Sequence, residues 1–269
     1  MLEQCLLSVE KACANIESEI FVVDNASTDG SDLYFNNRFE KIAFQWNKEN
    51  VGFAKANNSV IDKVSGDYIL FLNPDTIVPV NCFDECIDFF VKHSDCGALG
   101  VRMIDENGTY LKESKRGFPD PKTSFYKMIG LHRLFPTSRV FAKYYEGHLS
   151  ENKSNHVDVL SGAFMMLSKD ALRNVKGFDE DFFMYGEDID LSCRIIQSGF
   201  KNYYFADTTI THYKGKSTSY KSASYTKHFY DAMKIFVKKY FFGKKLTMYF
   251  LFAGIEFGRA IANFKRLLF

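Results

Sequence analysis

The chain has 269 residues and a formal net charge of +1; 46% of its residues are hydrophobic and 25% are charged. This composition excludes a disordered chain, and the length fits one elaborated domain or two small ones. The near-neutral charge argues against a nucleic-acid partner, which requires many basic residues to neutralise phosphates. Six cysteines form no Cys-x-x-Cys pair, which predicts reduced thiols in a cytosolic protein. The unusual feature is an excess of Phe and Tyr, 28 and 15 residues, beside one Trp.

The first hundred residues alternate helical and strand patterns at short intervals. This alternation is typical of an α/β fold whose central sheet is mostly parallel and flanked by helices. Apolar residues at helical spacing predict helices, and short all-apolar runs predict buried strands. The predicted helices are residues 2–14, 52–64 and 82–92. The predicted strands are residues 20–23, 42–44, 68–72 and 97–103, and Asn107-Gly108 then predicts a hairpin turn.

The pattern loosens after the hairpin and returns later in the chain. Residues 112–156 carry three prolines among aromatic and basic residues, which indicates a functional insertion or mobile segment. Regular structure is predicted again over residues 157–168. The helices predicted after it are residues 169–175, 187–198, 220–241 and 246–268. Two short strands are predicted at residues 203–205 and 209–212.

Charge is distributed unevenly along the chain. From residue 201 onward there are 13 Lys and Arg residues and three acids, whereas the first 200 residues carry 21 basic and 30 acidic residues. A lysine-rich run leads into the apolar residues 246–255, which are too few to span a bilayer and suited to lying on one. Residues 220–269 are therefore predicted to contact an anionic membrane surface. The alternative is that these helices pack on the core.

Polar side chains follow two of the predicted strands. Asp24 ends the strand at residues 20–23, and Asn73-Pro74-Asp75 follows the strand at residues 68–72. Open α/β sheets bind ligands beyond the carboxyl ends of their strands, so Asp24 is a candidate for holding a nucleotide base or ribose. The alternative for this segment is a turn with helix-capping residues. Carboxylates that meet at one sheet edge repel each other unless a cation such as Mg²⁺ joins them to substrate phosphates.

The densest acidic cluster lies among aromatic residues at residues 177–190. Several of its acids are expected to serve the first turn of a helix, where negative charge is favoured. Glu187 and Asp188 are expected to be partly desolvated, which raises the pKa of a carboxyl group and improves it as a base. His212 closes a predicted strand. A lone histidine is usually structural, and His212 becomes a candidate metal ligand only if it shares a site with Asp75.

Six motifs occur together in a fixed order. They are VVDNASTDGS at 22–31, NVGFAKANN at 50–58, LNPDT at 72–76, LSGAFMML at 160–167, GFDEDFFMYGEDIDL at 177–191 and HYKGKS at 212–217. Together they resemble the family 2 inverting glycosyltransferases, especially the rhamnosyltransferase-like branch that builds bacterial surface polysaccharides. The resemblance covers roughly residues 1–240. It implies the GT-A nucleotide-diphospho-sugar transferase fold with additional C-terminal helices.

The resemblance implies roles for individual residues. The donor nucleotide would be held by Asp24, Asn25, Asn50, Gly52, Asn57 and Asn73. Mg²⁺ or Mn²⁺ at the donor diphosphate would be ligated by Asp75 and His212. The sugar and the acceptor would be bordered by Gly162, Ala163 and Tyr185. Asp188 would be the catalytic base, with Glu187 beside it.

The resemblance also implies a domain organisation. A GT-A domain would span residues 1–219, with a nucleotide-binding half at about 1–103 and an acceptor half at about 104–219. The C-terminal helices would occupy residues 220–269. Relatives begin with an apolar strand before the first helix, and this chain starts at that helix. We therefore expect the first strand of the fold to be missing, through a late assigned start or truncation.

The implied function is metal-dependent transfer of a sugar, with rhamnose as a candidate, from a dTDP- or UDP-linked donor. The acceptor would be a saccharide or a polyprenyl-diphosphate-linked saccharide. The N-terminus lacks a signal-peptide pattern, so the expected location is cytoplasmic, at the inner face of the cell membrane. One alternative is a catalytically silent partner of a membrane glycan-assembly complex. Another is nucleotidyl transfer, for which the basic Gly-rich loop is lacking.

Overall fold

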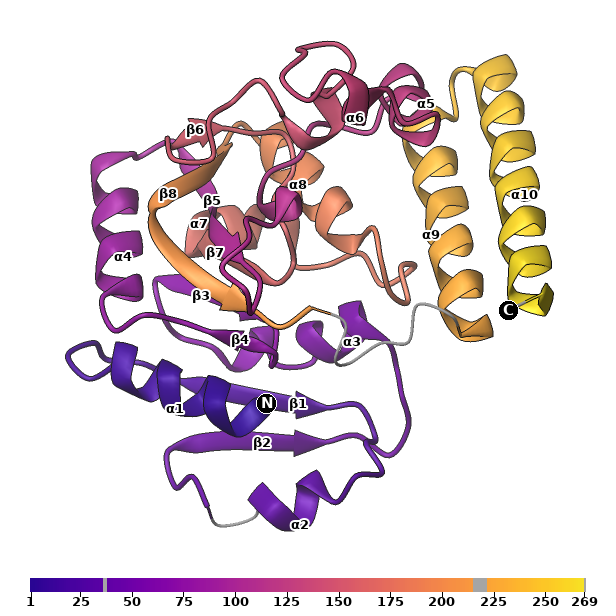
Figure 1. Cartoon of the computed structure of the whole chain (residues 1–269). Coiled ribbons are helices and arrows are strands. Elements are labelled where there is room, and N and C mark those ends of the chain that lie inside the picture. Colours follow the sequence, from indigo (N-terminus) through magenta and orange to yellow (C-terminus); the bar gives the residue numbers. More distant parts are fainter. Residues whose placement is uncertain (36–37, 215–221, 269) are drawn as a thin grey trace.

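The computed structural model describes residues 1–35, 38–214 and 222–268 (Figure 1). Its helices are α1 (Leu2–Ala12), α2 (Ser31–Phe35), α3 (Phe53–Asn58), α4 (Cys82–Lys92), α5 (Pro121–Met128), α6 (Leu131–Leu134), α7 (Lys169–Val175), α8 (Glu187–Gln197), α9 (Ala223–Phe241) and α10 (Lys245–Leu268). Its strands are β1 (Ile20–Asp24), β2 (Ile42–Trp46), β3 (Tyr68–Leu72), β4 (Thr76–Ile77), β5 (Cys96–Ile104), β6 (Asn155–His156), β7 (Phe164–Ser168) and β8 (Lys201–His212). The last residues of the HYKGKS motif lie outside the described residues.

The strands form two sheets. The main sheet has the order β3-β7-β5-β8-β4, with β6 beside β8, and β1 and β2 form a separate parallel pair. Among the described strands of the main sheet, only β5 and β8 pair in parallel, so the sheet is mixed and the prediction of a mostly parallel sheet is wrong. The reason is β7, which follows the long segment after β5 and enters between β3 and β5 in the opposite direction. Local periodicity does not encode that pairing.

Most predicted elements are present, and the differences have local causes. The helices at 82–92 and 169–175 and the strand at 68–72 have the predicted bounds. The two short strands predicted at 203–205 and 209–212 are parts of β8. Residues 206–208 are left out of its ladder with β5, because Val101 pairs with Phe205 and Arg102 with Thr209. The predicted hairpin is confirmed by a bridge between Ile104 and Tyr110.

The segment predicted to be a functional insertion or mobile segment, residues 112–156, contains the helices α5 and α6. α5 begins where the Asp120 carboxylate accepts a hydrogen bond from Thr123 N and Pro121 occupies the first turn. Both features are ordinary helix-start signals, since a proline lacks only an N–H that is unpaired there. The eight residues of α5 are too few and too polar to show a clear apolar period.

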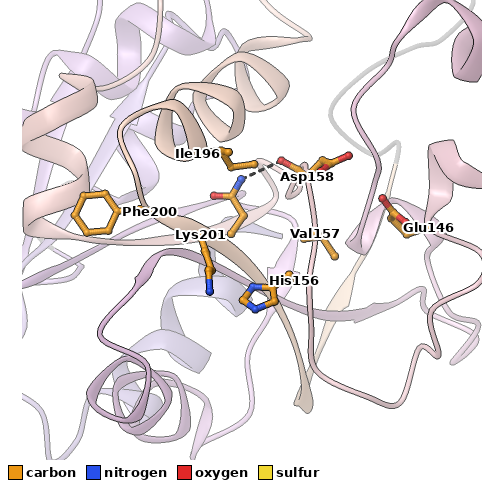
Figure 2. Close-up of a pocket in the computed structure, with 8 residues that line it drawn as sticks. Glu146, His156, Val157, Asp158, Ile196, Phe200 and Lys201 are labelled. Carbon is orange, nitrogen blue, oxygen red and sulfur yellow. Dashed lines mark hydrogen bonds between the residues drawn. The ribbon is translucent and has the colours of Figure 1, made fainter.

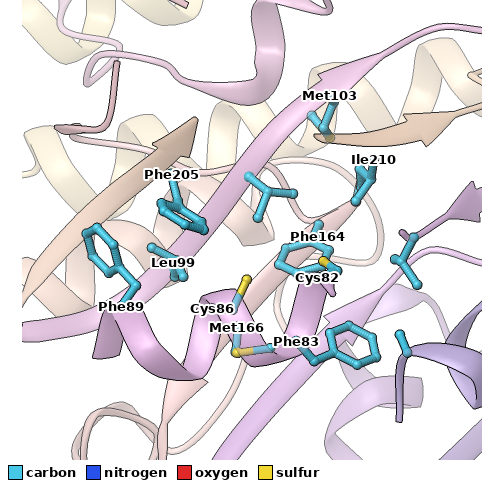
Figure 3. Close-up of a cluster of buried hydrophobic side chains, with 14 of the residues drawn as sticks. Cys82, Phe83, Cys86, Phe89, Leu99, Met103, Phe164, Met166, Phe205 and Ile210 are labelled. Carbon is cyan, nitrogen blue, oxygen red and sulfur yellow. The ribbon is translucent and has the colours of Figure 1, made fainter. Parts of the chain in front are cut away.

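The main sheet is buried on both faces because its strands are apolar on both faces. On one face, Leu99 and Met103 of β5 pack with Cys86 and Phe89 of α4 (Figure 3). Ala98 of β5 contributes to the cluster on the opposite face. That face is covered by α7 and α8, and its buried side chains include Leu172, Leu191 and Ile195. Successive side chains of β5 thus pack on opposite faces of the sheet, against α4 on one face and against α7 and α8 on the other.

The strands β1 and β3 each lie at an edge of their sheet. Among the described strands, β1 pairs only with β2, and β3 pairs only with β7. The predicted absence of a first strand stays a prediction, since pairing alone does not decide it. All six cysteines, which lie within the described residues, are free thiols, and five of them are buried.

Candidate active site

Asp75 and His212 lie side by side, although they are 137 residues apart in the sequence. The cause is the pairing of β4 with β8, which aligns Thr76 with His212 and places Asp75 directly before that register position. His212 Nε2 is 3.2 Å from Asp75 Oδ1, and both side chains are about nine-tenths buried. The pair is not aligned as a hydrogen bond, and within the described parts of the chain no donor reaches the buried Asp75 Oδ1 atom. The condition that made His212 a candidate ligand is therefore met.

A short loop, residues 161–163, joins the end of β3 to Asp188. Asn73 N donates a hydrogen bond to Ala163 O at 3.0 Å, and Gly162 N donates to Asp188 Oδ2 at 3.2 Å. A Cβ added to Gly162 would lie 3.4 Å from the Asp188 Cβ, so a small residue is favoured there. The end of β3 and the start of α8 thus converge on residues 161–163.

Asp188 is held by an arginine that the sequence analysis did not identify. Arg116 Nη2 is 2.5 Å from Asp188 Oδ2 and also donates to Leu160 O at 2.6 Å. Burial opposes the charge on Arg116, but the neighbouring Asp188 carboxylate raises the pKa of the guanidinium above its ordinary value. Arg116 lies in the segment before α5, where no periodic pattern marks it. Its role follows only from the tertiary contact.

The two neighbouring acids at the start of α8 differ in environment. Glu187 is buried, and its Oε2 atom has no hydrogen-bond partner. Burial, and secondly the Asp188 carboxylate, raises the pKa of Glu187 to about 8. The Asp188 side chain is 16% exposed and accepts hydrogen bonds at both oxygens. The expected desolvation therefore falls on Glu187, which carries a proton at neutral pH, and Asp188 faces the site.

Glu187→Gln is expected to flatten the pH dependence of folding stability. The folded-state pKa of about 8 exceeds the ordinary value of 4.5, so the stabilisation from this group is complete below pH 4.5 and is lost as the pH rises through 8. A neutral Gln removes the loss, which is at most about 5 kcal/mol at about 1.36 kcal/mol per pKa unit. Urea unfolding across this pH range measures the change. The exposed Glu106→Gln is the control, and equal slopes in wild type and Glu187→Gln would contradict the assignment.

The residues predicted to hold the nucleotide form a second cluster at the end of β1. Asn25 Nδ2 donates to Gly52 O at 3.0 Å, and Asn47 Nδ2 donates to Asn25 Oδ1 at 3.0 Å. Asn50 Oδ1 accepts from Gly52 N at 3.0 Å. Asp24 Oδ1 accepts from Ser27 N at 2.8 Å, so the turn proposed as the alternative for Asp24 is present. These contacts bring four of the six predicted donor residues together.

Gly52 packs this cluster against the loop before α8, residues 177–186, which we name the acidic loop. It has a φ of +89°, and an added Cβ would meet Phe183 O at 2.5 Å, so only glycine fits. Phe53 N donates to that same carbonyl at 2.8 Å. Asn57 is not brought into the cluster. Its Nδ2 donates to Phe53 O at 2.9 Å within α3, because the side chain lies over the preceding turn of its own helix.

The acidic loop is fixed from its other side by α9. The Tyr185 ring packs with the rings of Tyr225 and Phe229, and Tyr185 has a φ of +71°. Asp190, which is fully buried, is 2.7 Å from Lys239 Nζ and accepts a hydrogen bond from the Tyr240 hydroxyl at 2.9 Å. Tyr185, which was predicted to border the acceptor, therefore contributes to the contact between the acidic loop and α9. The basic C-terminal helices help to hold the start of α8.

A hollow of about 280 Å³ lies elsewhere, near the junction of β6 and β8 (Figure 2). It is lined by Glu146, His156, Val157, Asp158, Ile196, Phe200, Lys201 and Asn202. Burial, and secondly the Asp158 carboxylate, raises the pKa of Glu146 to about 7. None of the predicted site residues lines this hollow.

Within residues 1–35, 38–214 and 222–268, no cluster of three or more His, Cys, Asp or Glu side chains could hold a metal ion. At the predicted metal position the described residues therefore supply two candidate ligands, Asp75 and His212.

The order of the motifs and the contacts between their residues point to a single family. The profile described as Glycosyl transferase family 2 matches residues 1–176, more than half of the chain. The chain belongs to glycosyl transferase family 2. It is therefore a glycosyltransferase, as the motifs predicted. A second profile, described as N-terminal domain of galactosyltransferase, matches residues 149–226, which include the acidic loop and α8.

Two relatives of this family 2 chain are rhamnosyltransferases. The N-acetylglucosaminyl-diphospho-decaprenol L-rhamnosyltransferase of Mycobacterium tuberculosis is 26% identical over 247 residues, which cover 88% of this chain and 79% of the relative. The rhamnosyltransferase WbbL of Escherichia coli K12 is 29% identical over 177 residues, which cover 60% of this chain and 61% of the relative. The predicted resemblance to the rhamnosyltransferase-like branch is confirmed.

Solved structures confirm the fold. GalNAc-T7 with UDP, GalNAc and Mn²⁺ superposes with a TM-score of 0.56 at 13% identity, over 86% of this chain and 45% of that one. S. aureus TarS 1-349 in complex with UDP-GlcNAc superposes with a TM-score of 0.55 at 17% identity, over 88% of this chain and 61% of that one. The family 2 chain thus spans less than two thirds of either solved chain, and it shares with both the α/β architecture predicted as GT-A.

Proposed function

We propose that this glycosyltransferase moves a sugar from a nucleoside-diphosphate donor to a saccharide or polyprenyl-diphosphate-linked acceptor, in the synthesis of a surface polysaccharide. One observation carries the proposal: the loop at residues 161–163 contacts both the Asp188 carboxylate and Asn73, which lies two residues before the Asp75–His212 pair. Rhamnose is the first candidate sugar, because two relatives are rhamnosyltransferases. The name of the mycobacterial relative supports a polyprenyl-diphosphate acceptor.

A divalent cation, Mg²⁺ or Mn²⁺, fits the Asp75–His212 pair. Asp75 Oδ1 is buried and has no hydrogen-bond donor among the described residues, and a carboxylate oxygen in that state is stabilised by a cation. Magnesium sites commonly use one or two protein carboxylates and take their other ligands from substrate phosphates and water. When bound, the cation would offset the negative charge that develops on the departing diphosphate.

The chain's own residues perform the remaining steps. The acceptor hydroxyl loses its proton to Asp188 as its oxygen forms the new bond to the anomeric carbon, and the bond from that carbon to the diphosphate oxygen breaks. Attack from the face opposite the leaving group inverts the anomeric centre. Gly162 leaves room for the reacting groups beside Asp188, and the cluster of Asn25, Asn50 and Gly52 borders the nucleotide.

Arg116 positions the base. Its ion pair and the N–H of Gly162 both engage Asp188 Oδ2, which fixes the plane of the carboxylate. Oδ1 accepts only from Ile189 N at 2.8 Å among the described contacts, so it is the oxygen with spare accepting capacity. Glu187 stays protonated beneath it and adds no second negative charge at neutral pH.

A donor screen tests the proposal. The chain is incubated with Mn²⁺ and with dTDP-rhamnose, UDP-GlcNAc or a GDP-sugar in turn, with a lipid-diphosphate-linked saccharide as acceptor. We expect release of the nucleoside diphosphate and a glycosylated product with one donor, both of which EDTA abolishes. Binding of no nucleotide at all would instead support the silent-partner alternative.

The location of the reaction belongs to the same proposal. Among the described helices, none is long and apolar enough to cross a bilayer. α10 presents an exposed stripe of apolar side chains, of which Leu246 is 87% and Phe250 74% exposed. Lys244 and Lys245 precede this stripe. We therefore place the protein at the cytoplasmic face of the cell membrane, in peripheral contact through residues 220–269.

A further inference from the structure

A second exposed apolar surface lies on the segment between the hairpin and β6. We name it the α5–α6 surface; its members are Phe125, Met128, Ile129, Leu134 and Phe135. Met128 is 72% and Leu134 73% exposed, although side chains of this kind are normally buried. Thr123, on the opposite side of α5, is buried. The helix therefore directs its apolar residues outward.

The same segment is strongly basic. Residues 121–145 contain five Lys and Arg residues and no Asp or Glu. Lys122, Arg133 and Arg139 are exposed. Exposed cations interspersed with aliphatic and aromatic side chains complement an anionic lipid surface, where the apolar groups enter the acyl boundary and the cations meet the headgroups.

The α5–α6 surface and the turn between α9 and α10 lie at the same end of the molecule (Figure 1). The chain leading into α5 packs on the end of α9: the ring of Phe118 lies 5.5 Å from that of Phe236 and 5.8 Å from that of Tyr240. The turn exposes Phe242 and the two lysines that follow it. Segments more than a hundred residues apart thus present similar chemistry on one side.

We propose that the α5–α6 surface and the α9–α10 turn together form a two-part docking surface for an anionic phospholipid bilayer. The inference rests on the proposed membrane location and extends it to a segment outside the C-terminal helices. Its consequence concerns the active site. Arg116, which contacts Asp188, is two residues from Phe118, so docking through α5 places the segment that holds Asp188 on the side of the domain that faces the bilayer. A lipid-linked acceptor diphosphate would then reach the site without leaving the headgroup layer.

Flotation with vesicles tests the docking surface without donor or acceptor, so its result does not depend on the transfer reaction. The full chain is mixed with phosphatidylcholine vesicles that contain or lack 30% phosphatidylglycerol. We expect binding to the anionic vesicles to weaken with added NaCl. The variant Met128→Ser/Ile129→Ser/Leu134→Ser should bind at least about tenfold more weakly, because three apolar contacts with the bilayer are lost. Lys122→Glu/Arg133→Glu should cause a similar loss on anionic vesicles alone.

Matched controls come from other faces of the chain. Leu33 and Val91 are 81% and 72% exposed on α2 and α4, and Leu33→Ser/Val91→Ser should bind like the wild type. The substituted side chains are all exposed, so circular dichroism should show unchanged folding. Wild-type affinity in the α5–α6 variants, or no vesicle binding by the wild type, would overturn the proposal. Equal losses in the control variant would also overturn it, because the effect would not be specific to this surface.

Discussion

Asp188→Asn is expected to slow sugar transfer by about 10²–10⁴-fold, the usual contribution of a general base, and to leave nucleotide-sugar binding intact. An amide oxygen can still accept hydrogen bonds from Gly162 N, but it cannot take the acceptor proton. Transfer is measured as product formed under saturating donor, and binding is measured by calorimetry. The exposed Asp181→Asn, in the same acidic loop, is the matched control and should transfer at the wild-type rate.

The Arg116 contact complicates this variant in a way that can be measured. Removing the carboxylate leaves a buried guanidinium without its counter-ion, which costs about 3–5 kcal/mol at buried pairs. The double variant Asp188→Asn/Arg116→Met removes both charges and should recover thermal stability without recovering transfer. Recovery of transfer in the double variant, or wild-type transfer in Asp188→Asn, would show that Asp188 is not the base.

Asp75→Asn is expected to remove the part of nucleotide affinity that depends on a divalent cation. In the wild type we expect Mn²⁺ to raise the melting temperature with UDP, dTDP or GDP above that with the nucleotide and EDTA. An amide is a weaker ligand than a carboxylate, so metal-supported binding should fall at least about tenfold, the loss typical of changes around a metal site. Thermal shift across a Mn²⁺ titration measures this.

The control for Asp75→Asn is Asp207→Asn, an exposed acid on the same strand as His212. It should keep the wild-type response to Mn²⁺. His212→Gln should weaken the response in the same direction as Asp75→Asn, because both side chains face one point. An unchanged Mn²⁺ response in Asp75→Asn would place the cation elsewhere, and nucleotide binding without any metal effect would remove it from the proposed mechanism.

The elements with strong local signals were predictable from the sequence. The bounds of β3, α4 and α7 follow from apolar periodicity and from punctuation such as Asn73-Pro74. α5 was missed because its eight residues are too few and too polar to show a clear apolar period. β4 was missed because two residues carry no period, although this strand brings Asp75 to His212.

The Phe and Tyr excess has a partly structural explanation. Phe118, Tyr185 and Phe236 contribute to the cluster that joins α9 to the acidic loop, where they fill the space between the helix and the domain. Others, such as Phe242 and Phe250, are exposed at the proposed membrane surface. Composition alone could not separate these two groups, because burial depends on which segments meet.

The sequence by itself determined the family, the order of the motifs and most of the residues now placed around the site. Each motif is one short stretch of the sequence, so it can be recognised without knowing which distant segments are in contact. Only the tertiary structure decided the mixed sheet and the ion pair of Arg116 with Asp188, residues 72 positions apart. It also decided that burial raises the pKa of Glu187 and leaves Asp188 facing the site. The physical reason is the same in each case: strand pairing and burial depend on contacts between distant segments, which no local pattern specifies.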